Sequence, residues 1–154
     1  MAGYSGTPLV LKLGIKEGAR VFLVNAPKDY VKLISPVPKG VRFSSRLSSG
    51  TDLVHIFSTE QRQLREALRA ALPKLMQDGT IWVSWPKKSA RLPTDITENI
   101  VREVALPLGL VDIKICAVDE VWSGLKLVIR KALRQPAGPT RPSIRRGGAP
   151  DISS

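Results

Sequence analysis

The residues that have the chemistry to bind a ligand follow the ends of apolar segments in this sequence. Two tryptophans offer flat surfaces for stacking, and nearby lysines attract phosphate or carboxylate. The candidate ligand-binding residues are Asn25, Lys28, Thr59, Trp85, Lys87, Lys88, Asp119, Glu120, Trp122 and Ser123. A structural alternative stays open, in which Trp85 packs against Trp122 and Asp119 or Glu120 pairs with Lys87 or Lys88.

Residue types that build catalytic and metal sites are scarce. His55 is the only histidine and falls in an apolar segment, which favours a buried, hydrogen-bonded imidazole over a general base. Cys116 is the only cysteine, also in an apolar run, and is expected to be a small buried hydrophobe. One histidine and one cysteine do not form an ordinary zinc site. Asp119 and Glu120 are adjacent and point in different directions, so no metal, cofactor or catalytic residue is predicted.

Apolar segments alternate with helical patterns along most of the chain. The predicted strands are residues 19–24, 41–47, 52–57, 80–85, 110–118 and 125–130, with a turn at Asp78-Gly79 before the fourth of them. A short helix is predicted at 29–34. Thr59 is expected to cap a longer helix that ends near Leu75, and Thr94 or Asp95 to cap a helix that ends at 106–109.

These elements predict an α/β fold with a mostly parallel, Rossmann-like sheet. Strands separated by helices imply parallel crossovers, whereas the last two strands, joined by residues 119–124 without a helix, imply an antiparallel hairpin. One strand near the edge is therefore reversed, and the exposed edge is expected at residues 125–130 or 41–47. In open parallel sheets, ligands bind outside the carboxyl ends of the strands, where the candidate residues gather.

Four segments resemble Rossmann-like methyltransferases. Residues 13–21 resemble the lead-in to their first strand, and residues 52–54 the start of their fourth strand. Residues 72–83 resemble the helix, turn and fifth strand, and the closing hairpin resembles the sixth and seventh strands. The resemblance implies a truncated methyltransferase-like fold, for which S-adenosylmethionine would be the usual cofactor.

The residues that hold this cofactor in methyltransferases are not present. Asn25-Ala26-Pro27-Lys28 follows the first strand in place of a glycine-rich turn, and Pro27 removes an amide donor. Arg46 stands near the end of the second strand, where an acidic residue would contact the ribose. The interval from Val24 to Asp52 is too short for two strands with full helices. We therefore expect a degenerate cofactor site and the loss of one strand and one helix.

The chain as a whole is more similar to a family of small uncharacterised bacterial proteins, a domain of unknown function common in actinobacteria. The shared segments are Tyr4-Ser5-Gly6-Thr7-Pro8, Val24-Asn25-Ala26-Pro27, residues 82–88 and residues 117–125. This resemblance covers nearly all of the chain except its C-terminal tail. It implies the same fold and no established activity.

Composition sets the remaining expectations. The 154 residues are 43% hydrophobic, enough for one core, and we expect a lead-in segment (1–18), a Rossmann-like domain (19–131) and a disordered basic tail rich in Pro, Gly and Arg (132–154). No apolar run is long enough to cross a bilayer and no signal peptide is recognisable, so a cytoplasmic location is predicted. The net charge of +11 belongs mainly to the predicted domain.

The charge and the fold together predict a noncatalytic binding or regulatory protein that recognises an anionic ligand or partner. The partner would be a small phosphorylated or carboxylated metabolite, an acidic protein or nucleic acid, and not a membrane. One alternative is a divergent S-adenosylmethionine- or nucleotide-dependent enzyme. Another is a nucleic-acid accessory protein that works through its basic surface.

Overall fold

A computed structural model describes residues 7–135. The helices are α1 (Leu9–Leu13), α2 (Tyr30–Ile34), α3 (Gln61–Ala71) and α4 (Glu98–Ala105). The strands are β1 (Arg20–Val24), β2 (Arg42–Ser44), β3 (Thr51–Phe57), β4 (Leu75–Pro86), β5 (Leu110–Ala117) and β6 (Trp122–Ile129). Most of the predicted tail, 132–154, and the start of the lead-in segment lie outside the described residues.

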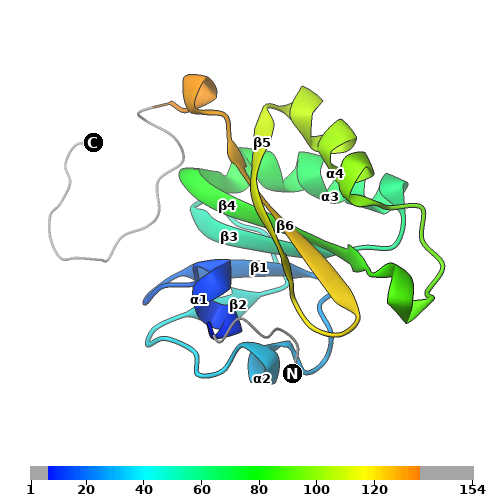
Figure 1. Cartoon of the computed structure of the whole chain (residues 1–154). Helices are drawn as coiled ribbons and strands as arrows, with labels where there is room; N and C mark the ends of the chain where they lie inside the picture. Colours follow the sequence, from blue (N-terminus) through cyan, green and yellow to red (C-terminus); the bar gives the residue numbers. More distant parts are fainter. Residues whose placement is uncertain (1–6, 136–154) are drawn as a thin grey trace, which may run out of the picture.

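The strands form one sheet in the order β2-β1-β3-β4-β6-β5 (Figure 1). β2, β1, β3 and β4 run parallel to one another, whereas β6 runs antiparallel to both β4 and β5. The predicted α/β fold with a mostly parallel sheet, one reversed strand and a closing hairpin is confirmed. The prediction that residues 125–130 form an edge is wrong, because β6 is inserted between β4 and β5.

The sheet has an apolar cluster on each face. α3 and α4 pack together on one face, where α3 contacts β3 and α4 contacts β5 and β6. The other face is covered by α1 and α2, which lie over the β1 side of the sheet (Figure 1). Successive residues of β4 alternate between the clusters, with Ile81 and Val83 facing α3 and α4 and Trp82 facing the opposite side. No helix in residues 7–135 has the length and apolar character to cross a membrane.

β4 begins five residues earlier than predicted. Asp78-Gly79 is not a turn before the strand but lies within it, opposite a register shift in which Thr51 pairs with Leu75 and Leu53 with Thr80. Asp78-Gly79 favours a turn, and the strand accommodates this preference as a local irregularity instead of ending there. A Cβ at Gly79 would lie 2.7 Å from Leu75 Cδ1 and 2.9 Å from the Asp52 carbonyl oxygen, so glycine is needed for this close approach.

The predicted caps of α3 (Thr59) and of α4 (Thr94 or Asp95) are both wrong. The polar groups of the loop before α4 form hydrogen bonds with the start of α3 instead. Thr59 lies before Glu60, the N-cap position of α3, and its carbonyl accepts a hydrogen bond from Thr94 Oγ1 at 2.7 Å. The Asp95 carboxylate accepts the Gln61 backbone N–H at 2.8 Å, at the start of α3 rather than α4. The cap of α4 is Thr97, whose hydroxyl accepts the backbone N–H of Ile100 at 3.2 Å.

The interval between β1 and β3 holds only α2 and β2, in agreement with the expected loss of one strand and one helix. A consequence is visible on the face that carries α3 and α4. Those helices pack over the β3, β4 and β6 side, whereas Phe22 and Val24 of β1 lie at the margin of the cluster and are only half-buried (Figure 1). This part of the sheet is open.

Candidate functional site

The structure brings most of the predicted site residues to one edge of the sheet. β1, β3 and β4 are parallel, so Asn25, Lys28, Thr59, Lys87 and Lys88 all follow carboxyl ends of strands. The β5–β6 turn joins them, because the Lys87 backbone N–H donates to the Val121 carbonyl at 2.8 Å. Asn25, Lys28 and Lys88 are exposed, and Asn25 adopts a left-handed backbone conformation with φ of 55°. Ligand binding at this edge stays a prediction.

The two tryptophans do not share a cleft, nor do they pack against each other. Trp85 is 6% exposed and belongs to the cluster beneath α3 and α4. Trp122 packs on the opposite face, with its ring edge-on to Phe57 at a centroid distance of 5.1 Å. The pairing of Trp85 with Ser123 and of Pro86 with Trp122 explains this, because side chains alternate between faces along each strand.

The Asp119 side chain stabilises the hairpin turn and does not form an ion pair with a lysine. Its Oδ1 accepts the backbone N–H groups of Val121 and Trp122, both at 2.8 Å. The ion pairs found among residues 7–135 join Arg62 to Glu66 and Arg102 to Glu98 and Asp112. The expected pairing of Asp119 or Glu120 with Lys87 or Lys88 is therefore not formed.

His55 is fully buried and hydrogen-bonded at both ring nitrogens, as expected from its apolar segment. The Tyr30 hydroxyl lies 2.9 Å from Nδ1, and Ser84 Oγ lies 2.8 Å from Nε2. Burial lowers the pKa of His55 from 6.5 to about 3, so the ring is neutral at physiological pH. Cys116 is only half-buried, at the margin of the α1–α2 cluster, and burial raises the pKa of its thiol. Neither residue has the setting of a nucleophile or general base.

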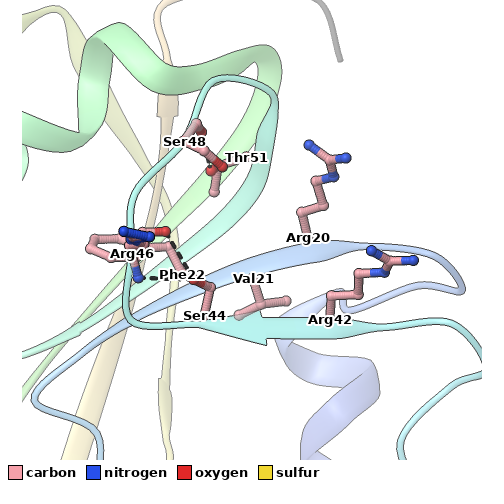
Figure 2. Close-up of a pocket in the computed structure, with 8 residues that line it drawn as sticks. All are labelled: Arg20, Val21, Phe22, Arg42, Ser44, Arg46, Ser48 and Thr51. Carbon is pink, nitrogen blue, oxygen red and sulfur yellow. Dashed lines mark hydrogen bonds between the residues drawn. The ribbon is translucent and has the colours of Figure 1, made fainter. Parts of the chain in front are cut away.

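A pocket that the sequence analysis did not identify lies on the open part of the sheet (Figure 2). We call it the arginine pocket. It has a volume of about 240 Å³ and is lined by Arg20, Val21, Phe22, Arg42, Ser44, Arg46, Ser48 and Thr51. Three guanidinium groups and three hydroxyl groups line it, and no carboxylate does. This combination of donors suits a phosphate or carboxylate ligand.

Strand pairing places two of the arginines side by side. Arg20 of β1 is the register partner of Arg42 of β2, and Figure 2 shows both side chains extending in the same direction from neighbouring strands. The Arg20 backbone N–H donates to Asp52 Oδ2 at 2.9 Å, which fixes the start of β1 against β3. None of the ion pairs in the described part of the chain involves a pocket arginine.

The loop after β2 forms the opposite wall. Ser44 Oγ donates to the Arg46 carbonyl at 2.9 Å and accepts the Arg46 backbone N–H at 2.8 Å, so the chain turns tightly there. Thr51 Oγ1 donates to the Ser48 carbonyl at 2.7 Å and closes the loop at the start of β3. A signal for this site was present in the sequence, since Arg42, Ser44 and Arg46 recur at a spacing of two, as do Arg20 and Phe22.

A second hollow lies beside the predicted edge, lined by Thr59, Glu60 and residues 92–95, with a volume of about 490 Å³. Thr59 is the one predicted site residue that lines it. The hollow has two acidic side chains, Glu60 and Asp95, and no basic one. Its charge does not suit an anion, so the arginine pocket is the stronger candidate site.

Comparisons with known proteins agree with this fold. The chain is similar in structure to a putative type 11 methyltransferase from Sulfolobus solfataricus, with 11% identity, a TM-score of 0.58, and coverage of 82% of this chain and 90% of that chain. A SAM dependent methyltransferase from Aquifex aeolicus gives 14% identity, a TM-score of 0.54, and coverage of 79% and 88%. A protein in the NADB-Rossmann superfamily from Streptococcus agalactiae gives 10% identity, a TM-score of 0.51, and coverage of 84% and 71%. At these identities the likeness shows the fold alone.

The family comparison gives a match to residues 47–131, more than half of the chain. The matching family is described as a protein of unknown function (DUF3052). The curated proteins give no match.

Proposed function

This chain belongs to the DUF3052 family of unknown function, and from that starting point we propose that it is a noncatalytic binding protein that recognises an anionic group in the arginine pocket. The observation that carries the proposal is that Arg20, Arg42 and Arg46 all line one pocket that has no lining carboxylate. Mutually repelling cations on an open sheet face are stabilised when an anion binds among them.

The chemistry of the pocket supports an oxyanion as the ligand. Guanidinium groups hydrogen-bond phosphate and carboxylate in a bidentate manner, and the hydroxyl of Ser48 offers a further donor. A volume of about 240 Å³ has room for about eight water molecules at roughly 30 Å³ each, which is enough for a small oxyanion with several water molecules.

The fold supports the methyltransferase alternative. The edge of the sheet at which the cofactor would bind gives it little support. Asn25-Ala26-Pro27 follows β1 where a glycine-rich turn would let backbone amides approach S-adenosylmethionine. The aromatic rings of Phe57 and Trp122 pack edge-on beside the ends of β3 and β6. A divergent S-adenosylmethionine- or nucleotide-dependent enzyme is therefore the second candidate, and stabilisation by these compounds is its distinguishing mark.

Isothermal titration of the full chain with sodium pyrophosphate at low salt tests the proposal. The Arg20→Gln, Arg42→Gln double variant is expected to lose about tenfold in affinity, equal to roughly 1.4 kcal/mol, because two charge-assisted contacts are removed. The matched control is Arg62→Gln, Arg69→Gln, which removes the same charge from exposed positions on α3. Its affinity should stay close to that of the unmodified chain.

Two further arms separate the alternatives. A Lys87→Ala, Lys88→Ala variant that loses binding while the arginine variant keeps it would move the site to the carboxyl edge of the sheet. An equal loss of pyrophosphate affinity in the pocket variant and in the control variant would show that binding depends only on the overall charge. If the chain does not bind pyrophosphate but is stabilised by S-adenosylmethionine, the enzyme is favoured instead.

A further inference from the structure

The arginine pocket has an aromatic surface beside its cations. Phe22 of β1 lines the pocket together with Arg20 and Arg42, and its side chain is only half-buried. Phe22 packs at the margin of the cluster beneath α3 and α4, whereas Val21 belongs to the cluster on the opposite face. Because side chains alternate between faces along a strand, Arg20 lies on the same face as Phe22. The ring and the cations are therefore neighbours on one surface.

The neighbouring strands leave one side of Phe22 uncovered. On β3 its register partner is Val54, which is fully buried. On β2 its register partner is Ser44, which is exposed and has a side chain too short to cover a phenyl ring. Ser44 Oγ is also held in the turn after β2, where it hydrogen-bonds the backbone of Arg46. The Phe22 ring thus presents apolar surface toward β2, the strand that carries Arg42.

The pocket has more room than an oxyanion needs. Its volume of about 240 Å³ corresponds to about eight water molecules, and a phosphate group fills about half of that space or less. Phe22 supplies an aromatic wall for the remainder. Arg46 lines the same pocket from the loop after β2, and a guanidinium group stacks favourably on a flat ring. The lining therefore suits a ligand that is anionic at one end and flat and apolar at the other.

We infer that the ligand of the arginine pocket is a phosphate ester with a flat aromatic ring close to its phosphate. This inference rests on the proposed function, since it requires that the pocket binds an anion. Arg20 and Arg42 hold the phosphate oxygens, and the ring of the ligand lies against Phe22 in an offset or edge-on arrangement. Phenolic phosphates and nucleotides both have this chemistry. In a phenolic phosphate the ring is bonded to a phosphate oxygen, whereas in a nucleotide a ribose separates the two groups.

Isothermal titration of the full chain with two phosphate esters tests the inference, at about pH 8, where both esters are dianions. Phenyl phosphate carries a flat ring, and cyclohexyl phosphate carries a puckered ring of similar size. Phenyl phosphate is expected to bind about fivefold more tightly, because aromatic pairs gain affinity beyond that of apolar contact alone. Inorganic phosphate, which has no ring, is the reference ligand.

The inference and the proposed function fail in different ways. Equal affinities for the two esters would overturn the inference and leave anion binding by the pocket intact. A chain that binds pyrophosphate but neither ester would also overturn it. A chain that binds none of these phosphate compounds would overturn the proposed function as well.

Variants of Phe22 identify the ring that makes the contact. Phe22→Leu should reduce the preference for phenyl phosphate over cyclohexyl phosphate to about one, with little change in affinity for inorganic phosphate. Phe22→Tyr retains an aromatic ring and should retain the preference. The matched control is Phe43→Leu on β2, because the Phe43 ring packs in the opposite cluster, edge-on to Tyr30. A preference that survives in Phe22→Leu would contradict the inference.

A measurement on the unmodified chain replaces the variant if Phe22→Leu does not fold, which circular dichroism would show. Ring protons of bound phenyl phosphate should give intermolecular nuclear Overhauser effects to the ring protons of Phe22 in NMR spectra. Absence of these effects at saturating phenyl phosphate would overturn the inference.

Adenosine monophosphate distinguishes the two sources of the ring in the same titration. Tighter binding than phenyl phosphate, lost in Phe22→Leu, would assign the ring to a nucleotide base. Weaker binding than phenyl phosphate would assign it to a phenolic phosphate.

Discussion

The neutral imidazole of His55 couples the stability of the fold to pH. Besides its two hydrogen bonds, the ring stacks on Phe57 at a centroid distance of 4.3 Å and meets the edge of Tyr30 at 5.4 Å. A proton on this ring would place an uncompensated charge inside the α1–α2 cluster. The unfolded chain, with a histidine pKa near 6.5, accepts the proton readily.

Acidification is therefore expected to destabilise the protein through this residue. Since the folded pKa is lowered to about 3, the stabilisation is fully present above pH 6.5 and is lost as the pH falls toward 3. Between pH 7 and pH 5 the loss amounts to about 2 kcal/mol. Urea unfolding at both pH values should show this decrement in the unmodified chain, and it should be absent from His55→Gln.

A spectroscopic measurement checks the same prediction without a variant. His55 is the only histidine, so its imidazole resonances are unambiguous in NMR spectra. They should not titrate between pH 7 and pH 5 in the folded protein. A midpoint near 6.5 would show that the ring is accessible to protons and would contradict the buried arrangement.

At the residue scale, the sequence predicted whether a side chain is buried better than it predicted which residues that side chain contacts. The apolar segment around His55 was sufficient to predict burial. The orientation of Trp85 and Trp122 was not predictable in the same way, because it depends on which residue of β6 lies opposite which residue of β4. A shift of one residue in that register would have put both rings on one face.

Among the elements, α4 depends on a single side-chain cap. The helix has eight residues, and its exposed start is satisfied by the Thr97 hydroxyl. Thr97→Ala is expected to lower the free energy of unfolding by about 1 kcal/mol, because the Ile100 N–H loses its acceptor. Urea unfolding measures the change. Thr97→Ser retains the hydroxyl and serves as the control, and equal losses in both variants would contradict a capping role.

Helix existence was predictable from periodicity, whereas the caps were not. Thr94, Asp95 and Thr97 all carry side chains that cap helices, and the sequence favoured the first two. The fold assigns Thr94 and Asp95 to contacts with Thr59 and Gln61, more than 30 residues earlier in the chain. Long-range contacts of this kind leave only Thr97 for α4.

The whole molecule combines a familiar sheet with an open face. The order of strands and helices predicted the α/β architecture, because each helix between parallel strands signals a crossover. The arginine pocket was not predicted, since it arises from the pairing of Arg20 with Arg42 and from the approach of the loop after β2 to the start of β3. Both are properties of the assembled sheet rather than of any one segment.

A chain that ends at Gln135 distinguishes binding by the arginine pocket from binding by the basic chain as a whole. Every residue of the arginine pocket is retained, so affinity for pyrophosphate should be unchanged in isothermal titration. A nucleic-acid accessory role predicts weaker binding of a short single-stranded oligonucleotide after Arg141, Arg145 and Arg146 are removed. Salt should then weaken oligonucleotide binding with a slope of about 0.7 per phosphate contacted. A loss of pyrophosphate affinity on truncation would contradict a self-contained pocket.

The position of β6 also governs how the chain reaches its folded state during synthesis. β6 is the last of the strands in residues 7–135 to be made, but it lies between β4 and β5 and supplies the partner for β4. Until residues 122–129 leave the ribosome, β4 presents residues 81–85 of its apolar segment along an unpaired edge. Unpaired apolar strands associate with other chains, so the nascent protein passes through an aggregation-prone stage that ends only when β6 inserts.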